Sequence, residues 1–404
     1  MRIIVIIKTY IDYCTDDSSY FRAGGAEAAG VDLLCSMTGK TNLQLELGVA
    51  RRKMWKKLPL LFLLGFVCST LSAAVEITDL GTLGGEWSEA YAMNDSNQVI
   101  GMSQTANGDD HAFLYSNGQM TDLYPLNSLR GMPMGINNAG QIAAGAVATD
   151  GRFYPAIYDH GNISVLGSLG GVLSNGFTGV ATAINESGQV AGYSHIPTRE
   201  WHAFLSDKGV MRDLGCTPNE RGVCYSYAID INDRGQIIGG IGGSDRAFLY
   251  ENGMMTQIEP FYSSGGRAYG INNSGQIAGY YFKDGLGHGF LYSKGTFTDI
   301  VKAESPYTTA FSINESGQVV GGAFVREREA CRMCDYRRHA ILFENGVVTD
   351  LNTLLPAGSA WELVWAYAIN NNGKIVGEGI IHGKTHAFLL ELPSPTAQAS
   401  RHRH

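Results

Sequence analysis

The chain has 404 residues, with 38 acidic side chains against 30 basic ones, and it contains 52 glycines. This length is enough for a large hydrophobic core, and the glycine content is typical of a protein with many turns. The formal net charge of −8 excludes a general attraction to phosphate-rich surfaces, so we expect no nucleic acid partner.

Residues 1–74 precede the regular part of the sequence. Residues 1–53 show no repeat and no clear hydrophobic period, and we interpret them as an upstream segment that is either untranslated or disordered. Residues 54–74 combine a basic start, a short apolar stretch and small residues ending at Ala74, which is the pattern of a secretory signal peptide. If translation starts at Met1 rather than Met54, the same segment is internal, and a cytoplasm-facing anchor is the alternative.

We expect cleavage near Ala74 to give a secreted or periplasmic protein. The apolar stretch is shorter than the ~20 residues that a membrane helix needs, so no stable membrane span is expected after cleavage. Residues 1–74 hold 9 of the Lys and Arg residues and 6 of the Asp and Glu residues, so the remainder carries a formal net charge of −11.

A motif based on Ile-Asn-x-x-Gly-Gln-Ile/Val recurs seven times in residues 75–392. A His-Ala-Phe-Leu-Tyr-like run follows each copy, and a Thr-Asp-Leu-like element follows most of these runs. The motif asparagines are 40 to 56 residues apart, close to the period of a four-stranded propeller blade. The sequence therefore predicts an all-β fold, a seven-bladed β-propeller of four-stranded antiparallel blades. The motif asparagines are Asn94, Asn137, Asn185, Asn232, Asn272, Asn314 and Asn370.

The repeats are offset from the chain ends by one strand. Thr78-Asp79-Leu80 precedes the first asparagine motif, whereas no such element follows the last His-Ala-Phe run, which begins at His386. An open array would leave two exposed strand edges, and radial closure removes them. We therefore expect residues 75–80 to pair with residues 386–392 and close a monomeric ring, followed by a disordered tail at 393–404.

The seven asparagines are predicted to have a structural role. Asn-x-x-Gly between two short apolar strands favours a hairpin in which the asparagine side chain binds the turn backbone and the glycine is left-handed. In the first repeat Asn97 replaces this glycine, and asparagine is the next most tolerant residue in that conformation.

Four cysteines lie beyond residue 74, all of them outside the repeated strands: Cys216, Cys224, Cys331 and Cys334. In an oxidising compartment we expect two local disulfides, Cys216 with Cys224 and Cys331 with Cys334. Four cysteines allow three connectivities, and the sequence does not choose among them. A redox role for Cys331-x-x-Cys334 lacks a βαβ context, and a zinc site lacks a second close pair of ligands.

The histidines that open the His-Ala-Phe runs raise the question of a metal site. Five repeats have histidine at this position, but Tyr154 and Arg246 occupy it in the other two. A ring of metal ligands would not include arginine, so we expect each histidine to hydrogen-bond an adjacent loop instead. We predict no metal and no cofactor. The histidines are His111, His202, His288, His339 and His386.

Three strings carry a resemblance to a known family: Asp79-Leu-Gly-Thr-Leu-Gly-Gly85, Ala183-Ile-Asn-Glu-Ser-Gly-Gln-Val-Ala-Gly192 and His202-Ala-Phe. In combination they resemble the HAF-repeat family of predicted bacterial extracellular proteins, over essentially all of residues 75–392. Repeats two and four depart by lacking the histidine, and the sixth repeat has a long insertion at 326–338. The resemblance implies export and a repeat architecture, and it transfers no catalytic residue.

In an antiparallel blade the two tight turns share one face of the ring, and the two variable connections share the opposite one. We call the second the variable face, and function in repeat proteins tends to lie on such a face. Aromatic and arginine side chains are frequent interface anchors, so we predict that those in the variable segments bind a ligand. They are Trp87, Tyr154, Arg199, Trp201, Tyr262, Tyr281, Arg328, Tyr336 and Trp361.

We expect a secreted or periplasmic binding or scaffold module whose ligand is a glycan or an envelope or extracellular protein. The alternative is an extracellular carbohydrate-active hydrolase or lyase that uses carboxylates of the variable face. No Gly-x-Ser-x-Gly elbow or His-Glu-x-x-His motif occurs in the sequence, so we assign no catalytic residue. The candidate carboxylates are Asp109, Asp110, Glu200, Asp245, Asp284 and Glu362.

The signal-peptide pattern predicts that the native protein begins near Val75 and lies outside the cytoplasm, because signal peptidase removes the segment ending at Ala74. N-terminal sequencing of protein from fractionated cells measures this directly. An intact start at Met1 in the cytoplasmic fraction would contradict the prediction.

Overall fold

The computed structural model describes residues 31–37, 43–49, 75–123, 132–218, 222, 224–242, 246–258, 265–302, 305, 307–326 and 336–392. The predicted signal peptide and the tail at 393–404 lie outside these ranges. The chain divides into two units, Met1–Thr70 and Leu71–His404. In the first unit, β1 (Val31–Met37) and β2 (Leu43–Val49) pair in antiparallel fashion. No helix in the described ranges is both long and apolar enough to span a bilayer.

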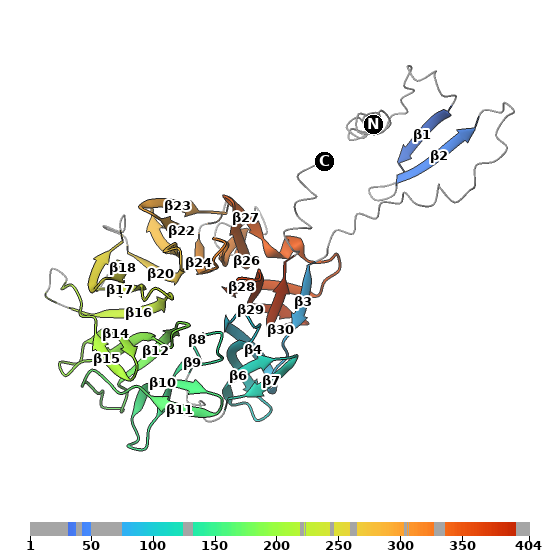
Figure 1. The fold of residues 1–404 in the computed structure, drawn as a ribbon. Helices are drawn as coiled ribbons and strands as arrows, with labels where there is room; N and C mark the ends of the chain where they lie inside the picture. The colour runs from blue at the N-terminus through green and yellow to red at the C-terminus, as the bar shows by residue number, and fades with distance from the viewer. Residues whose placement is uncertain are drawn as a thin grey trace. The chain divides into compact units, whose positions relative to one another are not determined.

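The second unit is a ring of seven four-stranded antiparallel sheets, as predicted (Figure 1). We number these sheets blades 1 to 7. In each blade the strands follow one another in the sheet, and in blades 1 to 6 they also follow chain order from the axis outward. A 3-10 helix, η2 (Leu351–Leu354), follows the outer strand of blade 6.

Blade 1 contains β4 (Gly84–Met93), β5 (Val99–Thr105), β6 (Asp110–Ser116) and β7 (Gln119–Asp122), and blade 2 contains β8 (Gly135–Ile136), β9 (Ile142–Val147), β10 (Phe153–Asp159) and β11 (Asn162–Val165). Blade 3 contains β12 (Gly179–Ile184), β13 (Val190–His195), β14 (Trp201–Asp207) and β15 (Val210–Asp213), and blade 4 contains β16 (Ser226–Ile231), β17 (Ile237–Ile241), β18 (Arg246–Glu251) and β19 (Met254–Gln257). Blade 5 contains β20 (Gly266–Ile271), β21 (Ile277–Lys283), β22 (Leu286–Ser293) and β23 (Thr296–Ile300), and blade 6 contains β24 (Thr308–Ile313), β25 (Val319–Arg326), β26 (Tyr336–Glu344) and β27 (Val347–Asp350). Blade 7 contains β28 (Trp361–Ile369), β29 (Lys374–Ile381), β30 (Lys384–Glu391) and β3 (Glu76–Asp79).

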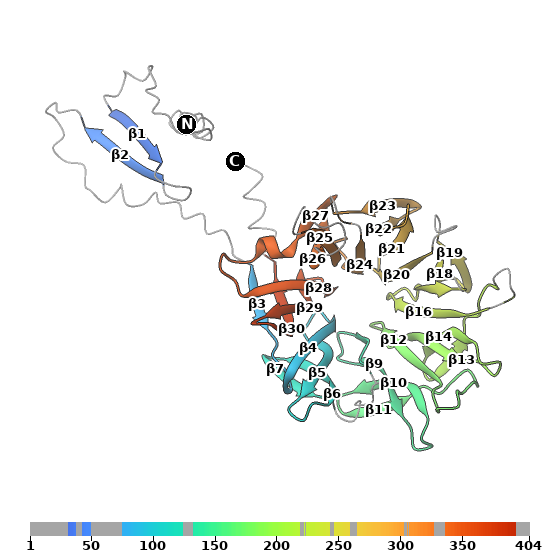
Figure 2. The ribbon, with the colours of Figure 1, turned by 180° about the vertical axis from the view of Figure 1, so that it is seen from behind.

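Blade 7 confirms the predicted closure of the ring. Its outer strand is β3, from the start of the repeat region, and it pairs with β30 from the end (Figure 2). The register runs from Glu76 opposite Glu391 to Asp79 opposite Phe388, and the Leu80 amide donates to the Ala387 carbonyl at 3.0 Å. The two ends of the repeat region therefore lie in one hydrogen-bonded sheet.

The His-Ala-Phe runs form the core between blades. The phenylalanine of five runs has no exposed surface, and each packs with alanine and branched apolar side chains from its own blade and a neighbour. Burying a phenylalanine side chain contributes roughly 1.5–3 kcal/mol, so these positions supply much of the hydrophobic stabilisation. The residues are Phe113, Phe204, Phe248, Phe290 and Phe388.

Each motif asparagine binds its own turn as predicted. Its Oδ1 accepts the amide of the residue four positions later at 2.9 to 3.0 Å in all seven blades. The residue three positions after the asparagine has a left-handed backbone in every blade, including Asn97 at a φ of 62°. The hairpin between the first two strands of every blade is thus closed by one side chain.

The same asparagines also join the blades, which the sequence did not reveal. The Nδ2 atom of each motif asparagine donates to the backbone carbonyl of the corresponding asparagine in the next blade, at 2.9 to 3.2 Å. The series runs from Asn94 through all seven blades and returns from Asn370 to Asn94. We call this closed circle of buried asparagines the axial ring.

A second closed circle lies beside the axial ring. The residue after each asparagine donates its amide to the side chain of the equivalent residue in the next blade, at 2.8 to 3.0 Å. The circle contains four carboxylates and three amides, whose oxygens accept these bonds. Its members are Asp95, Asn138, Glu186, Asp233, Asn273, Glu315 and Asn371.

Deletion of residues 75–80 should destabilise the ring strongly, because it removes β3 and the buried side chains Val75 and Leu80. Each lost hydrogen bond costs about 1 kcal/mol and each buried side chain somewhat more, out of a total stability of roughly 5–15 kcal/mol. Thermal melting and size-exclusion chromatography measure the effect, with deletion of residues 394–404 as the control. Equal melting temperatures for the two truncated proteins would contradict ring closure.

Candidate functional site

The variable face is where the inner strand of each blade begins. Each inner strand runs from that face to the asparagine turn, so the residues that precede the asparagine along it lie at successive levels between the two ends of the ring. At the turn end, the two hydrogen-bonded circles surround a polar hollow of about 170 Å³. The larger cavity lies toward the variable face.

This larger cavity has a volume of about 420 Å³ and lies among blades 5, 6 and 7. Five aromatic residues line it together with one threonine and one arginine. Because β24 begins at the variable face and β25 ends there, the cavity lies on that side of the ring. The lining residues are Tyr269, Tyr307, Thr309, Phe311, Phe324, Arg338 and Trp365, and we call this site the aromatic cavity.

The aromatic rings support one another. Phe311 lies 5.4 Å from Tyr269 and 5.5 Å from Trp365 between ring centroids, and Tyr307 lies 5.7 Å from Phe324. These distances and the near-perpendicular or tilted planes are those of favourable aromatic pairs. The cavity wall is therefore formed before any ligand arrives.

The position of Trp365 depends on a glycine in the neighbouring blade. A Cβ atom added to Gly322 on β25 would lie 2.0 Å from Cε3 of the Trp365 ring, far inside van der Waals contact. The indole therefore lies flat over the β25 backbone, which a side chain at Gly322 would prevent. The Arg338 guanidinium lies 5.5 Å from the indole and 5.8 Å from the Phe324 ring, as in cation–π contacts.

A pair of carboxyl groups adjoins the aromatic cavity. Glu378 lies opposite Trp365 in the β28–β29 register, and its carboxyl group shares a hydrogen bond with Glu89 of blade 1. Burial raises the pKa of Glu378 to about 7, and the nearby Glu89 carboxylate adds to this rise. Tyr91 donates to Glu89 at 2.9 Å, and burial raises the pKa of the Tyr91 hydroxyl. The pair is therefore protonated once near neutral pH and offers both a donor and acceptors.

The predicted binding residues that the structure describes are distributed around the ring, and none of these seven lines the aromatic cavity. Trp87 and Trp361 pack against the apolar core. Tyr281 is 7% exposed in the blade 5 core and its hydroxyl donates to Asp299. Tyr154 donates to Asp150 at 2.9 Å. These contacts give the four side chains structural partners.

Other members of the predicted set do lie at the variable face. Trp201 is 39% exposed and its ring is 5.8 Å from His195 and 5.3 Å from Tyr225. Arg199 is in the adjacent turn, with a φ of 77°. Tyr336 begins β26 and is half-buried. Tyr262 and Arg328 lie outside the described residues.

Sequence reasoning missed the residues of the aromatic cavity, although a signal for them was present. The third residue before the motif asparagine is aromatic in four repeats, and two of these four aromatic residues line the cavity. A comparison of this single position across the repeats would have indicated an aromatic lining. The four residues are Tyr91, Tyr269, Phe311 and Tyr367.

The histidines of the His-Ala-Phe runs pair with aspartates, which corrects the expected loop contact. In each of the five blades, Nδ1 lies 2.7 to 3.6 Å from a carboxylate oxygen of the Thr-Asp-Leu element. That element is the outer strand of the same blade, because the two strands pair in register. The aspartates are Asp122, Asp213, Asp299, Asp350 and Asp79.

The Cys216–Cys224 disulfide is present, as predicted. Cys331 and Cys334 lie outside the described residues. Within the described ranges, one group brings three potential metal-binding atoms within 4.8 Å of one another: His202, Cys216 and Cys224. The two sulfur atoms are joined to each other, and metals bind cysteine as the thiolate, so the oxidised group lacks the ligands of a metal site.

No protein-family model matches the chain, and no curated protein matches it. Among solved structures, the propeller domain of the trilobed protease from Pyrococcus furiosus, described as having an open velcro topology, aligns with a TM-score of 0.50 and 10% identity over 76% of this chain and 94% of that one. Virginiamycin B lyase from Staphylococcus aureus aligns with a TM-score of 0.41 and 14% identity, covering 79% and 100%. The lectin of Aleuria aurantia, in complex with Fucalpha1-6GlcNAc, aligns with a TM-score of 0.32 and 13% identity, covering 78% and 99%. At these identities the likeness shows the propeller fold alone.

Substitution Glu378→Gln should remove a pH-dependent loss of stability. Glu378 has a pKa of about 7 in the folded protein against a usual value of 4.5, so the folded state binds more protons between these pH values. Its contribution to the free energy of unfolding therefore falls as pH rises from about 4.5 to 7, by at most about 3 kcal/mol. Urea denaturation from pH 4.5 to 8 measures the difference between the two proteins. A difference that stays constant with pH would contradict the assignment.

Proposed function

We propose that this chain is a secreted or periplasmic binding module that takes a neutral glycan in the aromatic cavity of its variable face. The aromatic cavity is the observation that carries the proposal. Resemblance to the HAF-repeat family and the Cys216–Cys224 disulfide support a location outside the cytoplasm, since disulfides persist in oxidising compartments.

The chemistry of the cavity suits a sugar ring. A pyranose has an apolar face of C–H groups and an edge of hydroxyl groups, so it needs aromatic faces and a few polar partners. Five aromatic rings provide the first, and Arg338 and Thr309 provide donors at the wall. A volume of about 420 Å³ lies in the range of small-molecule sites. The net charge of −8 disfavours polyanionic ligands.

A carbohydrate-active hydrolase or lyase is the second candidate, and the carboxyl pair is the observation in its favour. Glu378 holds a proton near neutral pH and is therefore a suitable general acid. However, glycosidases place their two carboxyl groups about 5 to 9.5 Å apart so that the substrate fits between them. Glu89 is instead close enough to Glu378 to raise its pKa, as an adjacent carboxylate does. The pair is better suited to binding hydroxyl groups than to cleaving a glycosidic bond.

The carboxylates singled out in the sequence do not form a catalytic pair either. Asp109, Asp110, Glu200, Asp284 and Glu362 are distributed over four blades, and Asp245 lies outside the described residues. Glu362 forms an ion pair with Arg337 at 2.8 Å.

Arg338→Ala should weaken glycan binding about tenfold or more, because the guanidinium is both a donor and part of the cavity wall. Arg337→Ala is the matched control, since this neighbour is also exposed and on β26, but its partner is Glu362 outside the cavity. The wild-type protein is first screened on an array of neutral glycans, and the dissociation constants of both variants are then measured by calorimetry.

Loss of binding in both variants to the same extent would contradict a site in the aromatic cavity, as would an array without any bound neutral glycan. Release of reducing ends or unsaturated sugars from the bound glycans, abolished by Glu378→Gln, would instead establish the hydrolase or lyase.

A further inference from the structure

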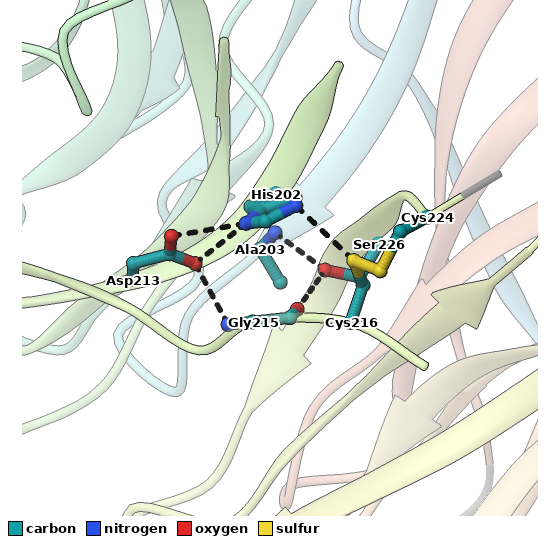
Figure 3. The surroundings of a disulfide bond; sticks show 7 residues. All are labelled: His202, Ala203, Asp213, Gly215, Cys216, Cys224 and Ser226. Atoms are coloured by element: carbon teal, nitrogen blue, oxygen red, sulfur yellow. Dashed lines mark hydrogen bonds and ion pairs between the residues drawn. A yellow bond between two sulfur atoms is a disulfide. The ribbon is translucent and has the colours of Figure 1, made fainter. Parts of the chain in front are cut away.

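His202, the histidine of blade 3, has a second partner besides its aspartate. Its Nε2 lies 3.1 Å from the Sγ of Cys216, which is bonded to Cys224 (Figure 3). On the other side of the ring, Nδ1 lies 2.9 Å from both carboxylate oxygens of Asp213. Asp213, His202 and Cys216 thus form a continuous series that ends on one sulfur of the disulfide.

Asp213 fixes the protonation of the imidazole. A carboxylate only accepts hydrogen bonds, so His202 Nδ1 carries the hydrogen and Nε2 is the nitrogen that faces the sulfur. The Gly215 amide donates to Asp213 at 2.7 Å and holds the carboxylate in place. An Nε2 in this position accepts the proton of a Cys216 thiol and, once protonated, donates to the thiolate.

Blade 7 contains the same arrangement of hydrogen bonds around its histidine and aspartate, but without the cysteine. His386 Nδ1 lies 2.9 Å from Asp79, and the Gly81 amide donates to Asp79 at 2.8 Å. Ser88 donates to the Gly81 carbonyl, as Ser226 does to that of Gly215. Thr82 follows Gly81 where Cys216 follows Gly215. The His–Asp pair is therefore a structural feature of the repeat, to which blade 3 adds a sulfur.

We propose that Cys216–Cys224 is a thiol–disulfide exchange site for an external dithiol, in which His202, held by Asp213, stabilises Cys216 as the leaving thiolate. His202 acts here as a positioning and proton-accepting residue. Both cysteines are partly exposed, so a thiol has access to them.

The exchange proceeds in two balanced displacements. One thiolate of the dithiol attacks Cys224 Sγ, the Cys216–Cys224 bond breaks, and its electron pair goes to Cys216. The second thiolate then attacks the dithiol sulfur of the mixed disulfide and releases Cys224. The dithiol is oxidised by two electrons, and its two protons pass to Cys224 and to the His202–Cys216 pair. Such exchange is faster when the leaving thiol is more acidic.

The charged groups around His202 favour this role. Asp213 contacts the ring directly, and Glu200 at the end of the preceding connection interacts electrostatically with it. Both groups are carboxylates, and their negative charge attracts the proton that leaves Cys216.

Pulsed alkylation of the reduced protein tests the proposal. The protein is reduced with dithiothreitol and treated briefly with iodoacetamide from pH 5 to 9, and peptide mass spectrometry follows each cysteine separately. We expect Cys216 to react with a midpoint at least about one pH unit below that of Cys224, which corresponds to about tenfold more thiolate in acidic solution. In His202→Ala the Cys216 midpoint should rise by a similar amount, while that of Cys224 stays unchanged.

The control is His386→Ala, which removes the equivalent His–Asp pair from blade 7 and should leave the Cys216 midpoint unchanged. Asp213→Asn retains the imidazole and should raise the Cys216 midpoint by a smaller amount, which provides a test if His202→Ala does not fold. Equal midpoints for Cys216 and Cys224 in the wild type would overturn the proposal. Equal shifts in His202→Ala and His386→Ala would also overturn it, because they would show a general effect of stability.

Discussion

The axial ring of seven buried asparagines is the constraint on which the rest of the molecule depends. Each side chain accepts a hydrogen bond from its own turn and donates one to the next blade, and the last donates back to Asn94 across 276 residues. Removal of any member leaves buried polar groups without partners, which costs more than the bond itself contributes. The ring therefore ties every turn to both neighbours and makes the blades mutually dependent.

The axial ring also determines which side chains meet near the axis. Because it aligns the seven inner strands, the residue three positions before each asparagine lies at the same level. Aromatic rings at this level form a row across blades 1, 7, 6 and 5, with centroid distances of 6.1, 5.4 and 5.4 Å between Tyr91, Tyr367, Phe311 and Tyr269. The aromatic cavity lies along this row, so the repeat that closes the fold also builds its candidate binding site.

The sequence predicted the features that repeat locally. Seven blades, closure by residues 75–80, the Asn-x-x-Gly turns and the Cys216–Cys224 disulfide all follow from spacing and residue type. Contacts between blades were not predictable, because they depend on the rotation from one blade to the next. The asparagine amide therefore looked like a turn residue alone, and Trp87 looked like a surface anchor although it packs against the core. The aromatic cavity was missed because its wall combines three blades.

Native-state hydrogen exchange of the seven turn amides that donate to the ring asparagines tests the closed, cooperative ring most directly. These amides run from Gln98 in blade 1 to Lys374 in blade 7. If the ring is closed and cooperative, all seven amides exchange only through global unfolding, with equal free energies of opening. Fast exchange confined to the turns of blades 1 and 7, with protection retained in blades 3 to 5, would show an array that opens at its ends and would contradict the account.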